Sequence, residues 1–508
     1  ADNYPFNAEK ENKILPFWDR GVVLCPYTKS EQNYIGTCKF EYIRSKRVYT
    51  LKMCAFVACV ILVCLVINSV KPQGHDLHNQ VETKGPYLSA TIVYKWKTME
   101  YEWPNASMKE QYVQNGKYIP KNSAINGIKI YKGKVYATIP RLKSGVPSTL
   151  NVIVEDTNNI TSETHLLRPF PSWDMQKLGD CHALQIVQSM EIDTETGWMW
   201  VVDTGYVPLD SSMVRPLDAC AAKLVIFDLE RGEEVHRYVF PKTTVGGGLF
   251  YLNDIVLGYS SGSARYAFIS DTLDYKLVIY DYLLNISYTI DHQNMGVDPD
   301  YASINISGQV LQVPTGINGI AMSADFKYLY YSSVAGINLY RVSTSILMQH
   351  PVVRADFFDD VISMGSKASQ GDGMAYGVSD CLYYSALGKN AVYKWDIKMD
   401  HKDGKMDMSQ DSQMQLVTDP RMDWVDTLAF DGEGYLWFTT NNMIKFIGDP
   451  GVQEDEYNFF VWKIYTNDYS YLDRKHYGPT LGSSSLIFSF SLLLLSVLFQ
   501  VIFLFIGC

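Results

Sequence analysis

Apolar and polar residues alternate in short runs through most of the chain, and the runs repeat in a fixed order. A polar pair precedes an apolar run, a turn marked by Gly, Asp or Asn follows, and a second run rich in Tyr, Trp or Val returns. The copies of this order begin at Asn126, Gln188, Asn253, Asn318, Asp372 and Asp426. Alternation with β-branched and aromatic residues predicts a pair of antiparallel strands in every copy.

Third strands follow several of these pairs. They are AKLVIFDLE from Ala222, YKLVIYDY from Tyr275, INLYRVST from Ile337 and NAVYKWDI from Asn390. Six copies of about four strands each predict an all-β, six-bladed β-propeller over residues 85–466. We expect SATIVYKWKTMEYEW, residues 89–103, to supply the strand that completes the last blade. A two-sheet sandwich is the alternative, but it does not explain why the polar pair recurs.

Two apolar segments flank the predicted propeller and bear on where the protein resides. MCAFVACVILVCLVINSV, within residues 53–71, follows a basic flank that includes Arg44 and Arg47. This order is typical of a signal peptide, and an uncleaved signal anchor is the alternative. Both interpretations place the rest of the chain outside the cytosol. Residues 1–52 are then an N-terminal extension that need not belong to the mature protein.

The second apolar segment is LIFSFSLLLLSVLFQVIFLFIG, residues 486–507, and it is long enough to span a bilayer. It follows a polar spacer, residues 467–485, and no Lys or Arg comes after it. A hydrophobic tail behind small residues is typical of a GPI-attachment signal. A transmembrane anchor and an error in the sequence are the alternatives. We therefore expect a secreted or extracellular protein whose tether, if present, is a GPI or membrane anchor.

The cysteines of the predicted propeller are Cys181, Cys220 and Cys381. An oxidising compartment favours a disulfide between Cys181 and Cys220, which leaves Cys381 over. Secretion also agrees with four N-glycosylation acceptor motifs. These motifs place the acceptor at Asn105, Asn159, Asn285 and Asn305.

The formal net charge is -11, and no basic stripe crosses the predicted propeller, so a generic nucleic-acid partner is excluded. Residues 178–205, LGDCHALQIVQSMEIDTETGWMWVVDTG, gather a cysteine, a histidine and carboxylates. We interpret most of this stretch as a hairpin with Asp193 and Glu195 in its turn. His182 has no second ligand pair at zinc spacing, so no metal site is predicted. GYSSG at 258–262 matches a nucleophile motif but falls between two strands.

The first residue of each innermost propeller strand faces the central channel. These positions, which we call the ring residues, are Asn126, Gln188, Asn253, Asn318, Asp372 and Asp426. One interpretation is a water-filled funnel whose polar groups satisfy one another. The other is a ligand site at the channel mouth, where carboxylates favour a cation and amides orient it. A calcium ion would accept the same oxygen ligands.

Several long stretches identify a family. In chain order they include YKWKTMEYEWP, LLRPFPSW, LGDCHALQIVQSMEIDTETGWMWVVDTG, CAAKLVIFDL, GINGIAMSADFKYLYYSSVAGINLYRV, QGDGMAYGVSDCLYYSALGKNAVYKWD and WVDTLAFDGEGYLWFTTNNMIKF. On these stretches the chain resembles the insect yellow / major royal jelly protein family from Ser89 to about Tyr465. The resemblance implies a six-bladed propeller, secretion and the same Cys181–Cys220 bridge.

Members of this family differ in function. Some act in cuticle pigmentation and melanin formation, some are credited with converting dopachrome, and salivary members of blood-feeding flies bind biogenic amines at the channel mouth. The resemblance implies ligand contacts from the last blade. The matching positions, together with two ring residues, are Asp426, Thr427, Asn441, Asn442, Met443, Ile444, Asn253 and Asn318. Met443 or Ile444 stands where the family pattern has an aromatic wall.

We weigh three hypotheses for the function. The first is a secreted or tethered protein that binds a small aromatic amine, catechol or indole and acts around melanin or cuticle formation. Asp426 or Asp372 would face the ammonium group. The second is a dopachrome isomerase that uses the same two carboxylates for proton transfer. The third is a calcium-dependent lactonase-like hydrolase. The ring positions contain no Glu, and this argues against the third hypothesis. No motif predicts a cofactor.

Overall fold

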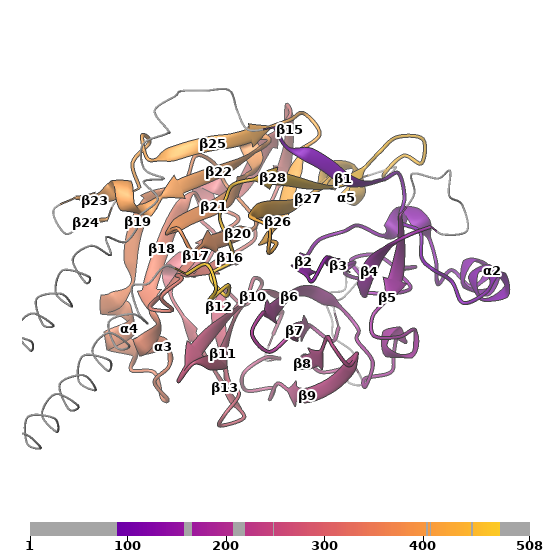
Figure 1. Ribbon diagram of the computed structural model, residues 1–508, viewed down its shortest axis with the longest axis horizontal. Coiled ribbons are helices and arrows are strands. Elements are labelled where there is room, and N and C mark those ends of the chain that lie inside the picture. Colours follow the sequence, from indigo (N-terminus) through magenta and orange to yellow (C-terminus); the bar gives the residue numbers. More distant parts are fainter. Residues whose placement is uncertain are drawn as a thin grey trace, which may run out of the picture. The chain divides into compact units, whose positions relative to one another are not determined.

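The computed structural model describes residues 89–156, 165–206, 219–246, 248–402, 405–406, 408–448 and 451–477. These residues form six four-stranded antiparallel sheets that are arranged around a central axis, as Figure 1 shows. The innermost strands of neighbouring sheets contact one another around the circle. The predicted six-bladed β-propeller is therefore confirmed. Each predicted copy of the repeat supplies the inner strands of one blade.

The blades follow the order of the chain. From the inner to the outer strand, they are β2 (Ile128–Tyr131), β3 (Lys134–Thr138), β4 (Leu150–Glu155) and β5 (His165–Pro169); β6 (Val187–Asp193), β7 (Trp198–Asp203), β8 (Lys223–Asp228) and β9 (Glu233–Val239); β10 (Leu252–Ser260), β11 (Ser263–Asp271), β12 (Lys276–Asp281) and β13 (Ile286–Asp291); β16 (Ile317–Met322), β17 (Tyr328–Ser333), β18 (Asn338–Ser343) and β19 (Ile362–Ser366); β20 (Met374–Gly377), β21 (Cys381–Ala386), β22 (Ala391–Asp396) and β25 (Gln413–Thr418); and β26 (Trp424–Phe430), β27 (Tyr435–Asn441), β28 (Phe459–Tyr465) and β1 (Thr91–Trp96).

Short elements decorate the blades. The helices are α2 (Ala106–Gln114), α3 (Thr344–Leu347), α4 (Arg354–Asp360) and α5 (Met443–Ile447), and two small hairpins are β14 (Ser303–Ile306) with β15 (Gln309–Gln312) and β23 (His401–Lys402) with β24 (Lys405–Met406). Within the described ranges, every helix is too short or too polar to cross a membrane. The predicted apolar segments 53–71 and 486–507 lie outside the described residues.

The ring closes through the last blade, as predicted. β1 pairs antiparallel with β28, from Thr91 opposite Lys463 to Trp96 opposite Phe459. The outermost strand of this blade thus comes from the start of the domain and the other three from its end. Main-chain pairing between the two ends of the domain closes the circle.

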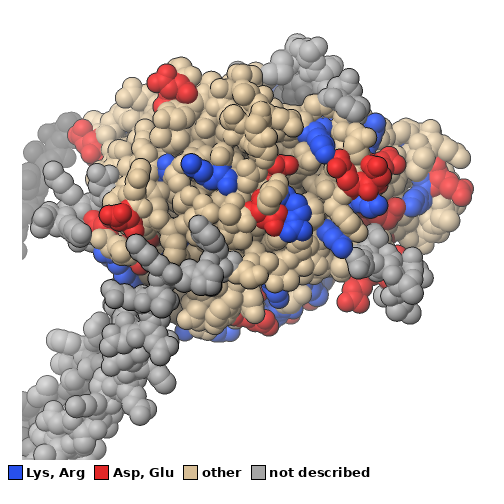
Figure 2. Space-filling model, turned by 90° about the horizontal axis from the view of Figure 1, so that it is seen from above, with Lys and Arg blue, Asp and Glu red and all other residues tan. Residues whose placement is uncertain are grey.

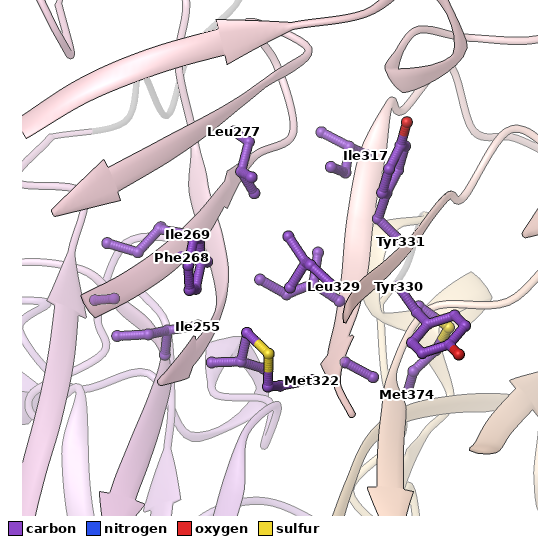
Figure 3. Close-up of a cluster of buried hydrophobic side chains, with 14 of the residues drawn as sticks. Ile255, Phe268, Ile269, Leu277, Ile317, Met322, Leu329, Tyr330, Tyr331 and Met374 are labelled. Atoms are coloured by element: carbon purple, nitrogen blue, oxygen red, sulfur yellow. The ribbon is translucent and has the colours of Figure 1, made fainter. Parts of the chain in front are cut away.

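Packing between blades forms the core. In Figure 3, Phe268 of β11, Leu329 of β17 and Met374 of β20 belong to one buried cluster that joins three consecutive blades. Strands such as β6 are buried along their whole length, because both faces of an inner strand are covered by neighbouring blades. Burial of this apolar surface is the main stabilising contribution to the fold.

Hydrogen bonds next to the ring residues tie three of the blades to the blade that follows. A hydroxyl on a second strand donates to the carbonyl of a ring residue in the following blade. The bonds are Thr138 to Gln188, Ser270 to Asn318 and Thr439 to Asn126, each 2.8 Å long. The bond from Thr439 joins the sixth blade to the first.

The second residue of the repeated pair has a packing role where it is glycine. A Cβ atom at Gly319 would overlap the carbonyl oxygen of Asp372, and one at Gly373 would overlap that of Asp426. Only glycine permits this close approach of neighbouring inner strands. The Asn-Gly and Asp-Gly pairs at these positions therefore mark contacts between blades rather than hairpin turns.

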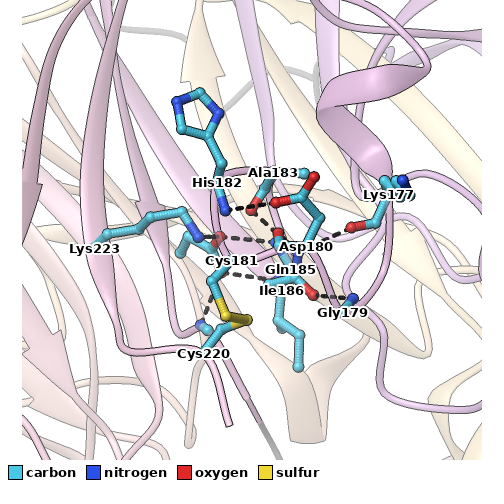
Figure 4. Close-up of a disulfide and its surroundings, with 12 residues drawn as sticks. Lys177, Gly179, Asp180, Cys181, His182, Ala183, Gln185, Ile186, Cys220 and Lys223 are labelled. Atoms are coloured by element: carbon cyan, nitrogen blue, oxygen red, sulfur yellow. Dashed lines mark hydrogen bonds and ion pairs between the residues drawn. A yellow bond between two sulfur atoms is a disulfide. The ribbon is translucent and has the colours of Figure 1, made fainter. Parts of the chain in front are cut away.

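The predicted disulfide is present between Cys181 and Cys220, whose Cα atoms are 5.0 Å apart. Figure 4 shows it beside Gln185, Ile186 and Lys223, at the start of blade 2. Cys381 is buried and is not in a disulfide.

After β28 the chain crosses the end of the propeller where the inner strands finish. We call residues 466–477 the C-terminal strap. Its backbone binds Gly434, Tyr376 and Val378, and Thr194 donates to its Leu472 carbonyl over 2.9 Å. Asp468, in the same strap, is buried and accepts the Tyr383 hydroxyl at 2.9 Å. The first part of the expected polar spacer, residues 467–477, therefore packs on the propeller.

Candidate functional site

A cavity lies on the propeller axis among the inner strands. The empty space among the side chains that line it is about 630 Å³, and this value includes space that is open to solvent. Of the residues predicted to bind a ligand, those that line it are Asn253, Asn318, Asp372, Asp426 and Thr427, and the ring residue Gln188 joins them. The inner strands thus bring together residues that are far apart in the sequence.

Asp426 is buried, and the described groups that hydrogen-bond to its carboxylate are all neutral. Its Oδ2 atom accepts from Asn126 Nδ2 at 2.9 Å and from Asn441 Nδ2 at 3.4 Å. Its Oδ1 atom accepts from the Thr427 hydroxyl at 3.4 Å. Burial, and then the nearby carboxylate of Asp372, raise the pKa of Asp426 well above its usual range. Within the described ranges, no cation lies in ion-pair distance of this carboxylate.

Each of the two amide side chains beside Asp426 has an oxygen without a hydrogen-bond partner among the described residues. The Oδ1 atoms of Asn126 and Asn441 are buried and have no hydrogen-bond partner among the described residues. A buried polar atom without a partner costs free energy, and native proteins seldom retain one without a reason. Asp426, Asn126 and Asn441 therefore form a cluster with unused acceptor capacity, suited to a ligand that carries hydrogen-bond donors.

Asp372 is the second buried carboxylate of the ring. Its Oδ2 atom accepts from Trp424 Nε1 at 2.6 Å, and its backbone N–H donates to the Ser385 hydroxyl at 2.7 Å. Burial raises the pKa of Asp372 to about 7, and the neighbouring Asp254 adds to this effect. Burial also lowers the pKa of Lys367, a positive neighbour of Asp372, to about 7. Asp372 and Lys367 are therefore two buried groups whose charges influence each other and whose pKa values both lie near 7.

Asp254 and Tyr251 were not predicted as site residues. Asp254 lines the cavity, accepts from the Ser189 hydroxyl and the Ile320 N–H at 3.1 Å each, and has a pKa that burial raises to about 6. The Tyr251 hydroxyl donates to Gln188 Oε1 over 2.6 Å. Burial, and then the charges of Asp426 and Asp372, raise the pKa of Tyr251. The sequence signal was weak, since it consists only of the closeness of both residues to Asn253 in the third polar pair.

The remaining predicted ligand residues lie at α5. Asn442 caps this helix by accepting from the Lys445 N–H at 3.3 Å. Met443 packs in a core cluster with Phe446, and Ile444 packs against that cluster. None of the three is among the residues that line the axial cavity. Asn441 reaches the site through its bond to Asp426.

At the strap end, a charged pair and a phenol line the same cavity. Lys129 Nζ lies 2.9 Å from the Glu191 carboxylate. The Tyr471 hydroxyl accepts from the Leu257 N–H at 2.8 Å and lies 3.4 Å from Glu191 Oε2. Tyr471 belongs to the C-terminal strap, so the segment that crosses this end also contributes to the cavity.

Other sequence motifs lie away from the axis. Ser260 pairs with Ser263 in the turn between β10 and β11, so GYSSG is in a hairpin, as expected. Asp193 accepts from the Glu195 N–H at 3.1 Å within the turn after β6. The His182 N–H donates to Asp180 at 3.0 Å. Across the described part of the chain, no group of three or more His, Cys, Asp or Glu side chains is arranged to hold a metal ion.

Three of the glycosylation motifs can be placed. Asn105, Asn285 and Asn305 are exposed, and Asn159 lies outside the described residues. The Oδ1 atoms of these three residues accept from Met108, Tyr280 and Gly308 respectively. Their amide nitrogens, to which a glycan would attach, carry none of these bonds.

The face drawn in Figure 2 shows no single charged area. Small groups of acidic and basic residues are interspersed there among uncharged ones. The carboxylates with a strongly raised pKa, Asp372 and Asp426, line the axial cavity instead.

Comparisons with known proteins agree with the resemblance. A family model described as Major royal jelly protein matches residues 186–471. The chain is 26% identical over 383 residues to Protein yellow of Drosophila pseudoobscura pseudoobscura, covering 73% of this chain and 65% of that protein. It is 28% identical over 316 residues to Protein yellow of Drosophila melanogaster, covering 60% of this chain and 57% of that protein. The matches thus span less than two thirds of these relatives.

Among solved structures, the chain is similar to virginiamycin B lyase from Staphylococcus aureus. The identity is 14%, the match covers 68% of this chain and 96% of that chain, and the TM-score is 0.35. A score this low carries no argument about function.

Proposed function

This chain belongs to the major royal jelly protein family, and on that premise we propose that its propeller is an extracellular domain that binds a small aromatic amine, catechol or indole in the axial channel. We further propose that it acts around melanin or cuticle formation, in keeping with its similarity to Protein yellow. The observation that carries the binding proposal is the cluster of Asp426, Asn126 and Asn441. In it, a buried carboxylate accepts from two amides whose oxygens have no hydrogen-bond partner among the described residues.

An ammonium group suits this cluster chemically. It would supply the charge that Asp426 lacks among the described residues and would donate to the unpartnered amide oxygens of Asn126 and Asn441. A buried carboxylate paired with such a cation is strongly stabilised relative to one buried alone. Asp372 lines the same cavity and adds negative potential.

Aromatic side chains near the ring residues favour an aromatic ligand. Tyr251 binds the ring residue Gln188, and Trp424 binds the ring residue Asp372. Each ring is held next to a ring residue, although neither is among the residues that line the cavity. Aromatic faces attract cations and stack with planar ligands.

Calorimetry on the full chain with dopamine and serotonin tests this proposal. We expect both amines to bind, and Asp426→Asn to weaken binding at least tenfold without unfolding the protein. The absence of any binding at millimolar amine would reject the proposal.

Ser287→Ala is the control for this measurement. Ser287 lies on the outer strand β13 and is not among the residues that line the axial cavity. Its hydroxyl contacts Tyr238 and Thr244, so the variant loses partly buried hydrogen bonds but leaves the cluster intact. Its affinity for both amines should equal that of the wild type.

A second function, dopachrome isomerisation, is favoured by one observation. Asp372 has a pKa of about 7, close to the value that suits a general acid or base at neutral pH. Loss of dopachrome absorbance would report this activity. The rate should fall in Asp372→Asn, and an unchanged rate in Asp372→Asn and Asp426→Asn would remove both carboxylates from the mechanism.

The extracellular location is part of the proposal and has its own tests. Exposure of Asn105, Asn285 and Asn305 supports glycosylation, and treatment with a glycosidase should increase the electrophoretic mobility of the protein expressed in insect cells. Release of the protein from cells by a phosphatidylinositol-specific phospholipase would identify a GPI tether. Retention after that treatment would favour a transmembrane anchor.

A further inference from the structure

A second cavity lies in blade 4, the blade of strands β16 to β19. The empty space among the residues that line it is about 620 Å³, and this value includes space that is open to solvent. Its walls come from residues 293–298, between β13 and β14, and from residues 333–340, where β17 ends and β18 begins. We call it the blade 4 pocket. Its lining residues are all different from those of the axial cavity, so the proposed function gives it no role.

Two asparagine side chains in this pocket are held by their oxygen atoms. The Oδ1 atom of Asn294 accepts from the Tyr331 hydroxyl at 2.9 Å, and that of Asn338 accepts from the Ser366 hydroxyl at 2.8 Å. Neither Nδ2 group donates to another described residue. Both amides therefore offer N–H donors to a ligand.

Asp298 supplies an acceptor in the same pocket. Its Oδ1 atom accepts from the Asp300 N–H at 3.1 Å, and its own N–H donates to the Ala335 carbonyl at 2.9 Å, which joins the two walls. The Oδ2 atom has no partner among the described residues. The other described residues that line the pocket are neutral, so an anionic ligand would meet a negative charge without a counter-charge.

The donor set is also a poor match for a metal ion. A calcium ion takes six to eight oxygen ligands. The pocket offers one carboxylate, that of Asp298, and its two asparagine oxygens already accept from hydroxyls. A neutral ligand that both accepts and donates hydrogen bonds suits these groups better.

Tyr340 adds an aromatic surface to the pocket. Its half-buried ring packs beside that of Tyr331, with the two ring centroids 5.6 Å apart. Val297 and Ala335 line the pocket as well. Apolar and aromatic walls with a few polar groups are the usual composition of a small-molecule pocket. The C–H groups of a sugar ring would pack on such walls while its hydroxyls meet the amides and the carboxylate.

We propose that the blade 4 pocket binds a neutral carbohydrate. The Asn294 and Asn338 amides donate to oxygen atoms of the sugar, and Asp298 accepts from one of its hydroxyls. A hydroxyl group is both a donor and an acceptor, so a ligand that carries several of them matches a pocket that mixes amide donors with a carboxylate. The inference goes beyond the proposed function and does not depend on it, because it concerns a separate site and a second class of ligand.

Binding of the full chain to an array of neutral and acidic oligosaccharides tests the proposal. The array is probed before and after enzymatic removal of the protein's own N-glycans, and we expect binding to neutral glycans. Binding in both states identifies a separate glycan as the ligand. Binding that appears only after the removal identifies the protein's own glycan, such as the one proposed at Asn305, as the occupant. No binding to neutral glycans in either state, or binding restricted to acidic ones, would overturn the proposal.

Three conservative variants locate the binding site. Asn294→Asp and Asn338→Asp keep the oxygens that accept from Tyr331 and Ser366 but lose the N–H donors. Each should weaken calorimetric binding of the best neutral glycan at least tenfold, and Asp298→Asn should weaken it about fivefold. Unchanged affinity in all three would overturn the proposal. Their dopamine affinity should equal that of the wild type, and a failure of dopamine to bind at all would reject only the proposed function.

Gln349→Glu is the matched control. It makes the same change from amide to carboxylate at an exposed residue just after α3, which follows the opposite end of β18 from Asn338. Its glycan affinity should equal that of the wild type, and thermal unfolding should show that all four variants are folded. An equal loss in Gln349→Glu and in the pocket variants would overturn the assignment of the site.

Discussion

Two buried aspartates show how similar residues acquire different roles. Asp203, at the end of β7, accepts four contacts of 2.8 Å: from the N–H groups of Gln185, Ile186 and Gly205, and from the Lys223 ammonium. Both side chains of this ion pair are almost fully buried. Each carboxylate oxygen thus has two partners, and the group fastens the start of blade 2 next to the disulfide.

Asp426 is buried to a similar degree but differs in its partners. Neutral amides and one hydroxyl contact it, and two of the neighbouring amide oxygens have no partner among the described residues. Burial alone therefore does not mark a functional carboxylate. The completeness of its partners separates a carboxylate that stabilises the fold from one that is suited to a ligand.

The largest effect that we predict is on stability, at Asp203. Asp203→Asn leaves the Lys223 ammonium buried without its counter-charge, and we expect a loss of about 3–5 kcal/mol in the free energy of unfolding. Chemical denaturation measures this value. Asp426→Asn should change it by less than about 1 kcal/mol, because the fold already favours the neutral form of that carboxyl. Equal losses in the two variants would contradict the comparison.

Removing the disulfide should have the next largest effect. The bridge joins residues 39 positions apart, and replacing both cysteines with serine should cost about 2–4 kcal/mol because the unfolded chain gains freedom. Thermal unfolding with and without reductant measures the loss. Binding of amines well below the unfolding temperature should be unchanged in the folded variant. A large loss of affinity without unfolding would mean that the region around Cys181 belongs to the site.

Stability and amine affinity should both depend on pH through the ring carboxylate Asp372. Asp372 has a folded-state pKa of about 7, above the ordinary value of 3.8, so its protonated form stabilises the fold. That contribution is present below about pH 4 and is lost as the pH rises through about 7. Amine affinity should change in the opposite direction, because the ammonium group prefers the ionised carboxylate.

Asp372→Asn should flatten both pH profiles between pH 4 and pH 8. Asp254, Asp426 and Lys367 also face this carboxyl, so a smaller residual slope is expected. Denaturation and calorimetry over that range provide the measurement. An affinity that falls as the pH rises from 5 to 7 would contradict an ionised carboxylate as the partner of the amine.

The smallest effect is expected at Tyr251. Tyr251→Phe removes the hydrogen bond to Gln188 but keeps the aromatic ring, so the free energy of unfolding should fall by about 1 kcal/mol. Amine affinity should fall less than tenfold. Tyr251→Leu should reduce affinity further, since it removes the ring. Equal affinities in the two variants would exclude a role for the aromatic face.

The fold could be predicted well because its signals are local. The repeated polar pair marked all six inner strands, and the run from Ser89 to Trp103 correctly completed the last blade. The Cys181–Cys220 bridge was also predicted correctly. The strands were predicted from periodicity along the chain, and the bridge from the number of cysteines in the propeller, the expected oxidising compartment and the family resemblance.

The site was harder to predict because its parts meet only in three dimensions. Lys129, Glu191 and Tyr471 come from the first blade, the second blade and the strap, and no spacing in the sequence relates them. Asp203 and Asp426 are both aspartates in apolar strands, and only their hydrogen-bond partners tell them apart. Residues at α5 matched the family pattern by position, yet Met443 packs into a core cluster with Phe446 and does not line the cavity.

The most direct test is calorimetry of dopamine with the full chain and with Asp426→Asn near neutral pH. We expect the wild type to bind one dopamine per chain, and Asp426→Asn, with nearly unchanged stability, to bind at least tenfold more weakly. Equal affinity in the two proteins, or no binding by the wild type at millimolar dopamine, would contradict the claim that this incomplete carboxylate cluster is the ligand site.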